Sequence, residues 1–131
     1  MNLKRVYIAG PISKGDLAGN IQRASDAFEA LALAGLAPFC PHWSCFSGRV
    51  QVTPGGSVYA VAGAQPNRLA HANWLAVDLA WVRESHAVLR LPGESTGADL
   101  EVAEARAWRI PVFVSVADVV AWSRGELVRS H

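Results

Sequence analysis

The residues of this chain with the clearest chemical potential lie in the stretch Leu91–Glu101 (LPGESTGADLE). An apolar run over residues 87–91 leads into it, and a helical pattern that ends near Trp108 follows it. The order is therefore strand, glycine turn and helix N-terminus. In an open parallel sheet, ligands bind at the carboxyl ends of the strands. Glu101 is thus expected to project toward a ligand crevice, where a carboxylate can act as a nucleophile or as a general base.

Two other ionisable side chains are suited to act with this carboxylate. Tyr7 lies near the carboxyl end of the first predicted strand, where it either packs in a half-buried strand or donates a hydrogen bond to the nucleophile. Asp78 sits among tryptophans and aliphatic residues of a predicted helix, either at its solvent edge or in a site where desolvation raises the pKa of its carboxyl. With Glu101 these residues form a carboxylate pair and a phenol, a set suited to glycosidic chemistry.

A glycine-rich loop, Gly10–Gly15 (GPISKG), follows the first predicted strand. Its glycines let backbone amides approach a ligand, while Ser13 offers a hydroxyl and Lys14 a positive charge, so the loop is suited to a phosphate near a helix N-terminus. It matches neither the P-loop pattern nor the dinucleotide fingerprint, and an ordinary Gly-Pro turn is the alternative interpretation. Ser95 likewise has two interpretations, as the N-cap of the later helix or as an anion contact.

Other catalytic and metal-binding arrangements fit poorly. His71 and His86 are isolated in the sequence, so no Ser-His-Asp order around a nucleophile is present. His42 with Cys40 and Cys45 makes only a partial metal-ligand set, because the cysteines do not form a C-x-x-C pair. No metal site is therefore predicted, and both thiols are expected to be reduced, as in a cytoplasmic protein.

Composition restricts the function classes further. Hydrophobic residues make up 51% of the chain and charged residues 18%, which indicates a compact globular protein. Lys and Arg number 12 against 11 Asp and Glu, and without a basic run or face this balance gives nucleic-acid binding little support. No apolar stretch approaches the roughly 18 residues of a membrane span, and no secretory leader pattern is visible.

The candidate residues need a scaffold of alternating strands and helices. Apolar runs predict strands over residues 6–9, 36–39, 87–91 and 110–114, and helical periodicity predicts helices over residues 20–33, 70–83, 96–108 and 117–124. This order predicts an α/β fold with a flavodoxin-like, doubly wound parallel sheet of four to five strands and helices on both faces. A single domain is expected over residues 1–131.

Residues 42–69 have no clean periodicity. They are predicted to form a long loop with a short helix around Val58–Ala62. This loop is expected either to cover the active site or to reach a neighbouring subunit. Elsewhere, Gly35 stands where a glycine ends a helix, and Ser115 where a serine begins one.

Taken together, these pieces resemble the nucleoside 2-deoxyribosyltransferase superfamily, including its nucleotide N-hydrolase branch and related phage and bacterial proteins. The matching motifs are Val6–Pro11, Gly35 with Pro38–Pro41, Asp78, and Ser95–Glu101 with Ile110–Val112. The resemblance implies that Glu101 attacks the anomeric carbon of a nucleoside or nucleotide, that Tyr7 positions this glutamate, and that Asp78 binds a sugar hydroxyl or helps to protonate the departing base. It also implies substrate-binding roles for Gly10, Ser13, Lys14, Ser95 and Gly97, with no metal or redox cofactor.

Ser95 bears on the choice between the branches. Transferases of this superfamily tend to carry an acidic residue six positions before the nucleophile, whereas a serine there resembles the hydrolases, in which it contacts the 5′-phosphate. A carboxylate would repel a phosphate, while a hydroxyl at a helix N-terminus accepts one. The leading hypothesis is therefore a cytoplasmic N-glycosidase that cleaves a (deoxy)nucleoside 5′-monophosphate through a covalent glycosyl-Glu101 intermediate.

Two alternatives remain open: deoxyribosyl transfer between bases, and a nucleotide-binding sensor without turnover. The resemblance also implies a homodimer or homotetramer whose neighbouring subunit completes the pocket. Residues 42–69 depart from both branches, so the base, the sugar and the access of water stay undetermined at this point.

Overall fold

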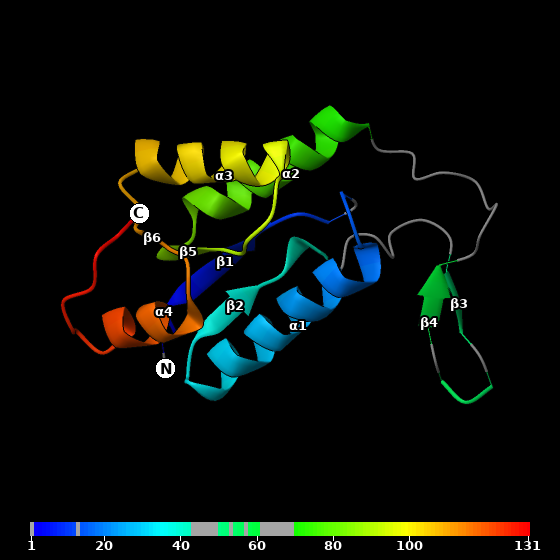
Figure 1. Cartoon of the computed structure of the whole chain (residues 1–131), viewed down its shortest axis with the longest axis horizontal. Helices are drawn as coiled ribbons and strands as arrows, with labels where there is room; N and C mark the ends of the chain where they lie inside the picture. Colours follow the sequence, from blue (N-terminus) through cyan, green and yellow to red (C-terminus); the bar gives the residue numbers. More distant parts are fainter. Residues whose placement is uncertain (1, 13, 43–49, 53, 57, 61–69) are drawn as a thin grey trace.

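The computed structural model of the chain describes residues 2–12, 14–42, 50–52, 54–56, 58–60 and 70–131 (Figure 1). In chain order, its elements are β1 (Arg5–Ala9), α1 (Leu17–Leu33), β2 (Ala37–Phe39), β3 (Val50–Val52), β4 (Val58–Ala60), α2 (His71–Arg83), β5 (Ala87–Arg90), α3 (Thr96–Ala107), β6 (Val112–Phe113) and α4 (Val116–Ser123).

The main sheet has four parallel strands in the order β2-β1-β5-β6. The register places Tyr7 opposite Phe39 on one side and opposite Val88 on the other. The predicted flavodoxin-like α/β fold is therefore confirmed, with four strands. The chain leaves β1 toward β2 and later crosses to β5 on the opposite side of β1, so the loops after β1 and β5 flank the point where the strand order reverses, which is where such sheets bind ligands.

The two faces of the sheet carry separate hydrophobic clusters. Side chains alternate along β1, so Val6 and Ile8 point to one face and Tyr7 and Ala9 to the other. The first face packs against α1 and α4, and the second against α2 and α3; Figure 1 shows these helix pairs on opposite sides of the sheet. Tyr7 and the helix that carries Glu101 therefore lie in the same layer.

The end of α1 shows how the sequence sets an element boundary. Gly35 has φ +87°, a conformation that favours glycine, and its amide donates to the carbonyl of Ala32 at 3.0 Å. The amide of Leu36 donates to the carbonyl of Leu31 at 3.1 Å, which completes a Schellman motif. The expected role of Gly35 is confirmed, and the motif turns the chain directly into β2.

The predicted short helix around residues 58–62 is wrong for the part that the structure describes. Residues 58–60 form β4, which pairs antiparallel with β3 so that Val50 lies opposite Ala60. Val58 and Tyr59 are of types that favour strands, and Gly56, with φ +88°, supports the turn between the two strands. Residues 61 and 62 lie outside the described residues.

Two other element boundaries differ from those that the sequence pattern predicted. The first helix begins at Leu17, three residues before the predicted start, and β6 contains two residues instead of five. Pro111 has no N–H to donate, and the strand pairing begins at Val112, next to it.

The outer edge of β6 is covered by the C-terminal segment. The amide of Val112 donates to Ser130 Oγ at 2.8 Å, and the amide of His131 donates to the carbonyl of Val112 at 2.6 Å. Arg106 Nε of α3 donates to the carbonyl of His131 at 3.1 Å. None of the helices in the described residues is long and apolar enough to cross a membrane.

Candidate active site

The loops after β1 and β5 touch at two glycines. A Cβ atom on Gly10 would stand 2.9 Å from the Cβ of Leu91, and one on Gly93 would stand 2.8 Å from the Cγ of Pro11. Gly93 also has φ +115°, which L side chains rarely adopt. Close packing of the two loops thus requires glycine at both positions, and at Gly10 this contact provides a structural reason for the residue beside any role in binding.

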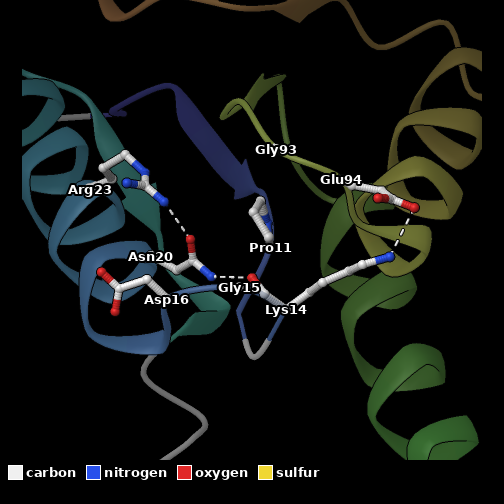
Figure 2. Close-up of a pocket in the computed structure, with 8 residues that line it drawn as sticks. All are labelled: Pro11, Lys14, Gly15, Asp16, Asn20, Arg23, Gly93 and Glu94. Atoms are coloured by element: carbon white, nitrogen blue, oxygen red, sulfur yellow. Dashed lines mark hydrogen bonds and ion pairs between the residues drawn. The ribbon is translucent and has the colours of Figure 1, made fainter.

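A cavity of about 420 Å³ lies beside this contact (Figure 2). Its lining comes from both loops and from the first turns of α1: Pro11, Lys14, Gly15, Asp16, Asn20, Arg23, Gly93 and Glu94. Lys14 reaches across to Glu94, with Nζ 2.8 Å from Oε1. Of the residues predicted to bind substrate, Lys14 lines this cavity, whereas Gly10, Ser95 and Gly97 are not among its lining residues.

Asn20 holds the first loop in shape. It is 3% exposed, and its Nδ2 donates to the carbonyls of Ile12 at 3.0 Å and Lys14 at 2.8 Å. Arg23 donates in turn to Asn20 Oδ1. The two loop carbonyls therefore point toward α1, and their oxygens are hydrogen-bonded within the protein. Ser13, between those carbonyls in sequence, lies outside the described residues.

The three predicted catalytic residues come from β1 and from the two helices, α2 and α3, that pack on one face of the sheet. Tyr7 on β1 is fully buried, Glu101 on α3 is 6% exposed, and Asp78 on α2 is half-buried. The structure places them close enough that each carboxyl group affects the ionisation of the phenol. None of the three lines the cavity beside Lys14. The predicted catalytic residues and the cavity beside Lys14 are therefore two separate features of the structure.

Burial dominates the ionisation of these groups. It raises the pKa of Glu101 to about 7; the nearby phenol of Tyr7 opposes this rise, the negative charge of Asp78 adds to it, and the positive charge of Arg90 opposes it. Burial also raises the pKa of Asp78 to about 6. The pKa of Tyr7 is raised far above its usual value, first by burial and then by the two carboxylates. Near neutral pH, Glu101 therefore exchanges between a nucleophilic and a protonated form.

Two polar atoms at the centre of this group are unpaired. Tyr7 Oη and Glu101 Oε2 are buried and have no hydrogen-bond partner in the described structure. The phenol is near enough to favour the ionised carboxylate, although the two groups do not meet hydrogen-bond geometry. An unpaired buried polar group costs about 1–3 kcal/mol and is uncommon in structural cores. Such a pair is typical of a site whose polar groups serve a ligand.

Ser95 has a structural role at the start of α3. Its Oγ accepts a hydrogen bond from the amide of Ala98 at 3.1 Å, so Ser95 is the N-cap. Ser115 caps α4 in the same way, through the amide of Asp118 at 3.1 Å. Around Gly97, an added Cβ would meet no atom within 4 Å, so the space beside this turn is open.

Several features of the site have no signal in the sequence alone. The rings of Tyr7 and Phe39 stack at 5.7 Å, and those of Phe39 and Trp81 at 5.3 Å, which links the buried phenol to the surface. His42 is fully buried, with Nε2 at 3.1 Å from the carbonyl of Pro11, and burial lowers the pKa of its imidazole. These contacts join residues far apart in the chain, so only the tertiary structure could reveal them.

Two members of the partial metal-ligand set, Cys40 and His42, lie in the described residues. Within the described residues, no three His, Cys, Asp or Glu side chains are grouped so as to hold a metal ion. His42 instead contacts the loop after β1. Cys45, the other member of the partial set besides Cys40, lies outside the described residues.

Comparisons with known proteins identify the fold. No protein-family model matches the chain, and no curated protein matches it. Among solved structures, a 2-deoxyribosyltransferase from Bacillus psychrosaccharolyticus is similar with a TM-score of 0.55 and 16% identity, covering 82% of this chain and 69% of that one. A conserved protein from Enterococcus faecalis V583 is similar with a TM-score of 0.55 and 18% identity, covering 85% of this chain and 62% of that one. The chain thus has a 2-deoxyribosyltransferase-like fold.

Proposed function

From this shared fold and the buried carboxylate of Glu101, we propose that the chain is an enzyme of the nucleoside 2-deoxyribosyltransferase superfamily. Its proposed reaction is hydrolysis of the base–sugar bond of a (deoxy)nucleoside 5′-monophosphate. The observation that carries the proposal is the group formed by Glu101, Tyr7 and Asp78, with its two unpaired polar atoms, at the strand-order switch.

In the proposed mechanism, a carboxylate oxygen of Glu101 attacks the anomeric carbon of the sugar. The bond from that carbon to the base nitrogen breaks, and the base leaves with the electron pair and takes up a proton. Asp78, whose pKa is raised to about 6, supplies that proton or binds a sugar hydroxyl. Water then attacks the same carbon and gives a proton to the Asp78 carboxylate, and the bond from this carbon to the Glu101 oxygen breaks. This step releases the sugar phosphate and regenerates both carboxyl groups. Tyr7 orients the carboxylate.

The position of Lys14 favours a phosphorylated substrate in this proposal. It is the cation on the loop after β1, and it lines the cavity at the strand-order switch. Its partner Glu94 is 80% exposed, so the ion pair is weak and a phosphate can compete for the ammonium group. In the proposal, Gly10 and Ser13 of this loop and Ser95 and Gly97 of the α3 turn complete the substrate contacts, and Ser95 does so beside its role as N-cap.

Deoxyribosyl transfer is the second candidate, favoured by the solved structure of a 2-deoxyribosyltransferase with this fold. In that reaction a second base, instead of water, attacks the glycosyl-Glu101 intermediate. Incubation of a deoxynucleoside with a different free base separates the two, because only a transferase forms the exchanged nucleoside.

The proposal treats residues 1–131 as one catalytic domain that acts in the cytoplasm as a homodimer or homotetramer, without a metal ion, a redox cofactor or nucleic acid. Exposed apolar side chains on α2 and β2 support an assembly, since Phe39 is 38%, Val77 45% and Trp81 50% exposed. Light scattering of the purified protein measures the number of subunits.

Chromatographic detection of free base, from all common nucleosides and their 5′-monophosphates, tests the reaction. The monophosphates are expected to be the better substrates, and Glu101→Gln is expected to abolish base release. Glu104→Gln is the matched control, because Glu104 lies one turn later on α3 and contacts Arg83 at 2.7 Å and Trp108 at 3.0 Å. Base release by Glu101→Gln at the wild-type rate would contradict the proposal.

A further inference from the structure

Arg90, at the carboxyl end of β5, has no role in the mechanism above. Only 17% of its side chain is exposed, and in the register it stands beside Ala9 of β1. Its guanidinium has three partners: Nη1 donates to the carbonyl of Leu91, and Nη2 donates to the carbonyl of Gly93 at 2.9 Å and to Asp99 Oδ1 at 3.1 Å. One side chain therefore contacts the strand end, the following turn and α3.

Two of these partners, Gly93 and Asp99, lie in or next to the elements that carry the predicted catalytic residues. Gly93 is the residue that packs against Pro11 of the facing loop. Asp99 stands in the first turn of α3, two residues before Glu101. A change in the turn would move the start of α3 relative to β1, and with it the distance between the carboxylate and the phenol of Tyr7.

We propose that Arg90 is a positioning residue for Glu101: its guanidinium holds the shape of the turn after β5 through the carbonyls of Leu91 and Gly93. This turn sets where α3 begins and thereby places the carboxylate beside Tyr7. This inference rests on the proposed function, in which Glu101 is the nucleophile. Arginine suits the task because its planar fork bonds several acceptors at once, whereas the ammonium of lysine is a compact point charge on a flexible stem.

The contacts to backbone carbonyls, more than the ion pair, give Arg90 this role. The side chain of Asp99 is 71% exposed, and ion pairs in solvent contribute little. The carbonyls of Leu91 and Gly93 belong to the backbone of the turn, so a bond to them acts on the turn directly. Loss of the Asp99 carboxylate should therefore matter much less than loss of the guanidinium.

Arg90 also acts on Glu101 through its charge. The groups that influence the Glu101 carboxyl are Tyr7 on β1, Asp78 on α2 and Arg90 on β5, and the positive charge of Arg90 favours the ionised form. Lysine at this position would keep the charge and lose the fork, whereas glutamine would lose both. The two variants thus separate positioning from electrostatics.

The test compares Arg90→Lys, Arg90→Gln and Asp99→Asn in base release from the best monophosphate substrate. Arg90→Lys is expected to lower kcat by up to about a hundredfold, the loss that a displacement of a reacting group by about 1 Å can cause, with little change in KM. Asp99→Asn is expected to stay within about twofold of wild type, as an exposed ion pair predicts. A wild-type kcat in Arg90→Lys would overturn the inference, and so would an equal loss in Asp99→Asn.

Titration of Glu101 by NMR, with carbon-13 in the glutamate carboxyl, provides a readout that does not need turnover. The midpoint should stay near that of wild type in Arg90→Lys and rise in Arg90→Gln, while the Glu101 carboxyl signal shifts in both variants. If the wild-type protein releases no base, the proposed function fails. The carboxyl signal then still decides on Arg90, and an unchanged signal in both variants would overturn the inference.

Discussion

At the scale of single residues, burial outweighs local charge in setting the ionisation of the site. It raises the pKa of Glu101 to about 7 and that of Asp78 to about 6, although Arg90 and Tyr7 both favour an ionised Glu101. The negative charge of Asp78 adds to the effect of burial on Glu101. Because the pKa of Glu101 is the higher of the two, a single proton lies mainly on Glu101, and the reactive form, with Glu101 ionised and Asp78 protonated, is the minor one.

This arrangement predicts opposite pH shifts for the two neighbours of Glu101. Asp78→Asn removes a negative charge, so the pKa of Glu101 should fall and the acidic limb of kcat/KM should move to lower pH. Tyr7→Phe removes the phenol that favours the ionised form, so the same limb should move to higher pH. The measurement is the pH profile of residual base release by each variant. Shifts in the same direction would contradict the assignment of these two roles.

At the scale of elements, the start of α3 combines a structural and a proposed binding role in Ser95. Ser95→Asp should keep the helix cap, because aspartate is as good an N-cap as serine, but its charge should repel a phosphate. We expect kcat/KM for a nucleoside monophosphate to fall at least about tenfold, or about 1.4 kcal/mol, with little change for the free nucleoside.

Ser95→Ala is the matched variant for this prediction. It should lower the free energy of unfolding by about 1 kcal/mol through loss of the cap, without adding a charge. If both variants reduced monophosphate cleavage equally, the hydroxyl itself and not charge would determine the preference. Equal cleavage of nucleoside and monophosphate by the wild-type protein would remove the phosphate role of Ser95 altogether.

The contact between the two loops gives a prediction on glycine. Gly93→Ala places a Cβ 2.8 Å from Pro11 at φ +115°, so it should lower the free energy of unfolding by about 1–3 kcal/mol. Gly97→Ala meets no atom within 4 Å and favours the helix, so its stability should equal or exceed that of wild type. Urea denaturation measures both. Reduced base release in Gly97→Ala would then reflect its proposed contact with substrate.

The elements were predictable wherever one physical pattern determined them. Residues 20–33 show helical periodicity, and the glycine at position 35 has the positive φ that a Schellman motif needs. The β3–β4 pair was missed because three-residue strands are too short to show alternation, and because Gly55 and Gly56 mark a turn without indicating what flanks it. The roles of Asn20 and Arg90 depend on carbonyls that only the folded turns bring within reach.

At the scale of the whole molecule, the buried carboxyl of Glu101 connects activity to stability. Its pKa is about 7 in the folded protein against 4.5 for an ordinary glutamate. Between these values, the unfolded chain has released the proton and the folded protein has kept it, so rising pH favours unfolding. Above about pH 7, the buried Glu101 carboxyl has lowered the free energy of unfolding of the wild-type protein by up to about 3 kcal/mol.

We therefore predict that Glu101→Gln is more stable than wild type above about pH 7, by up to about 3 kcal/mol, and that the difference disappears below about pH 4.5. Urea denaturation over a range of pH measures it. Glu104→Gln is the control with the opposite sign, because the hydrogen bond from Arg83 lowers the pKa of Glu104. A stability difference for Glu101→Gln that did not vary with pH would contradict the burial of an ionisable group.

The placement of the chain ends has a practical consequence. Residues 130 and 131 bond to Val112 where β6 begins, and the N-terminal residues lead into the start of β1, so both ends lie at the margin of the sheet opposite the glycine loops (Figure 1). A surface anchor or a fluorescent fusion at the N-terminus would leave the cavity beside Lys14 facing the solution. The protein is thus suited to immobilised biosensor assays, whereas a C-terminal anchor would pull on the segment that covers β6.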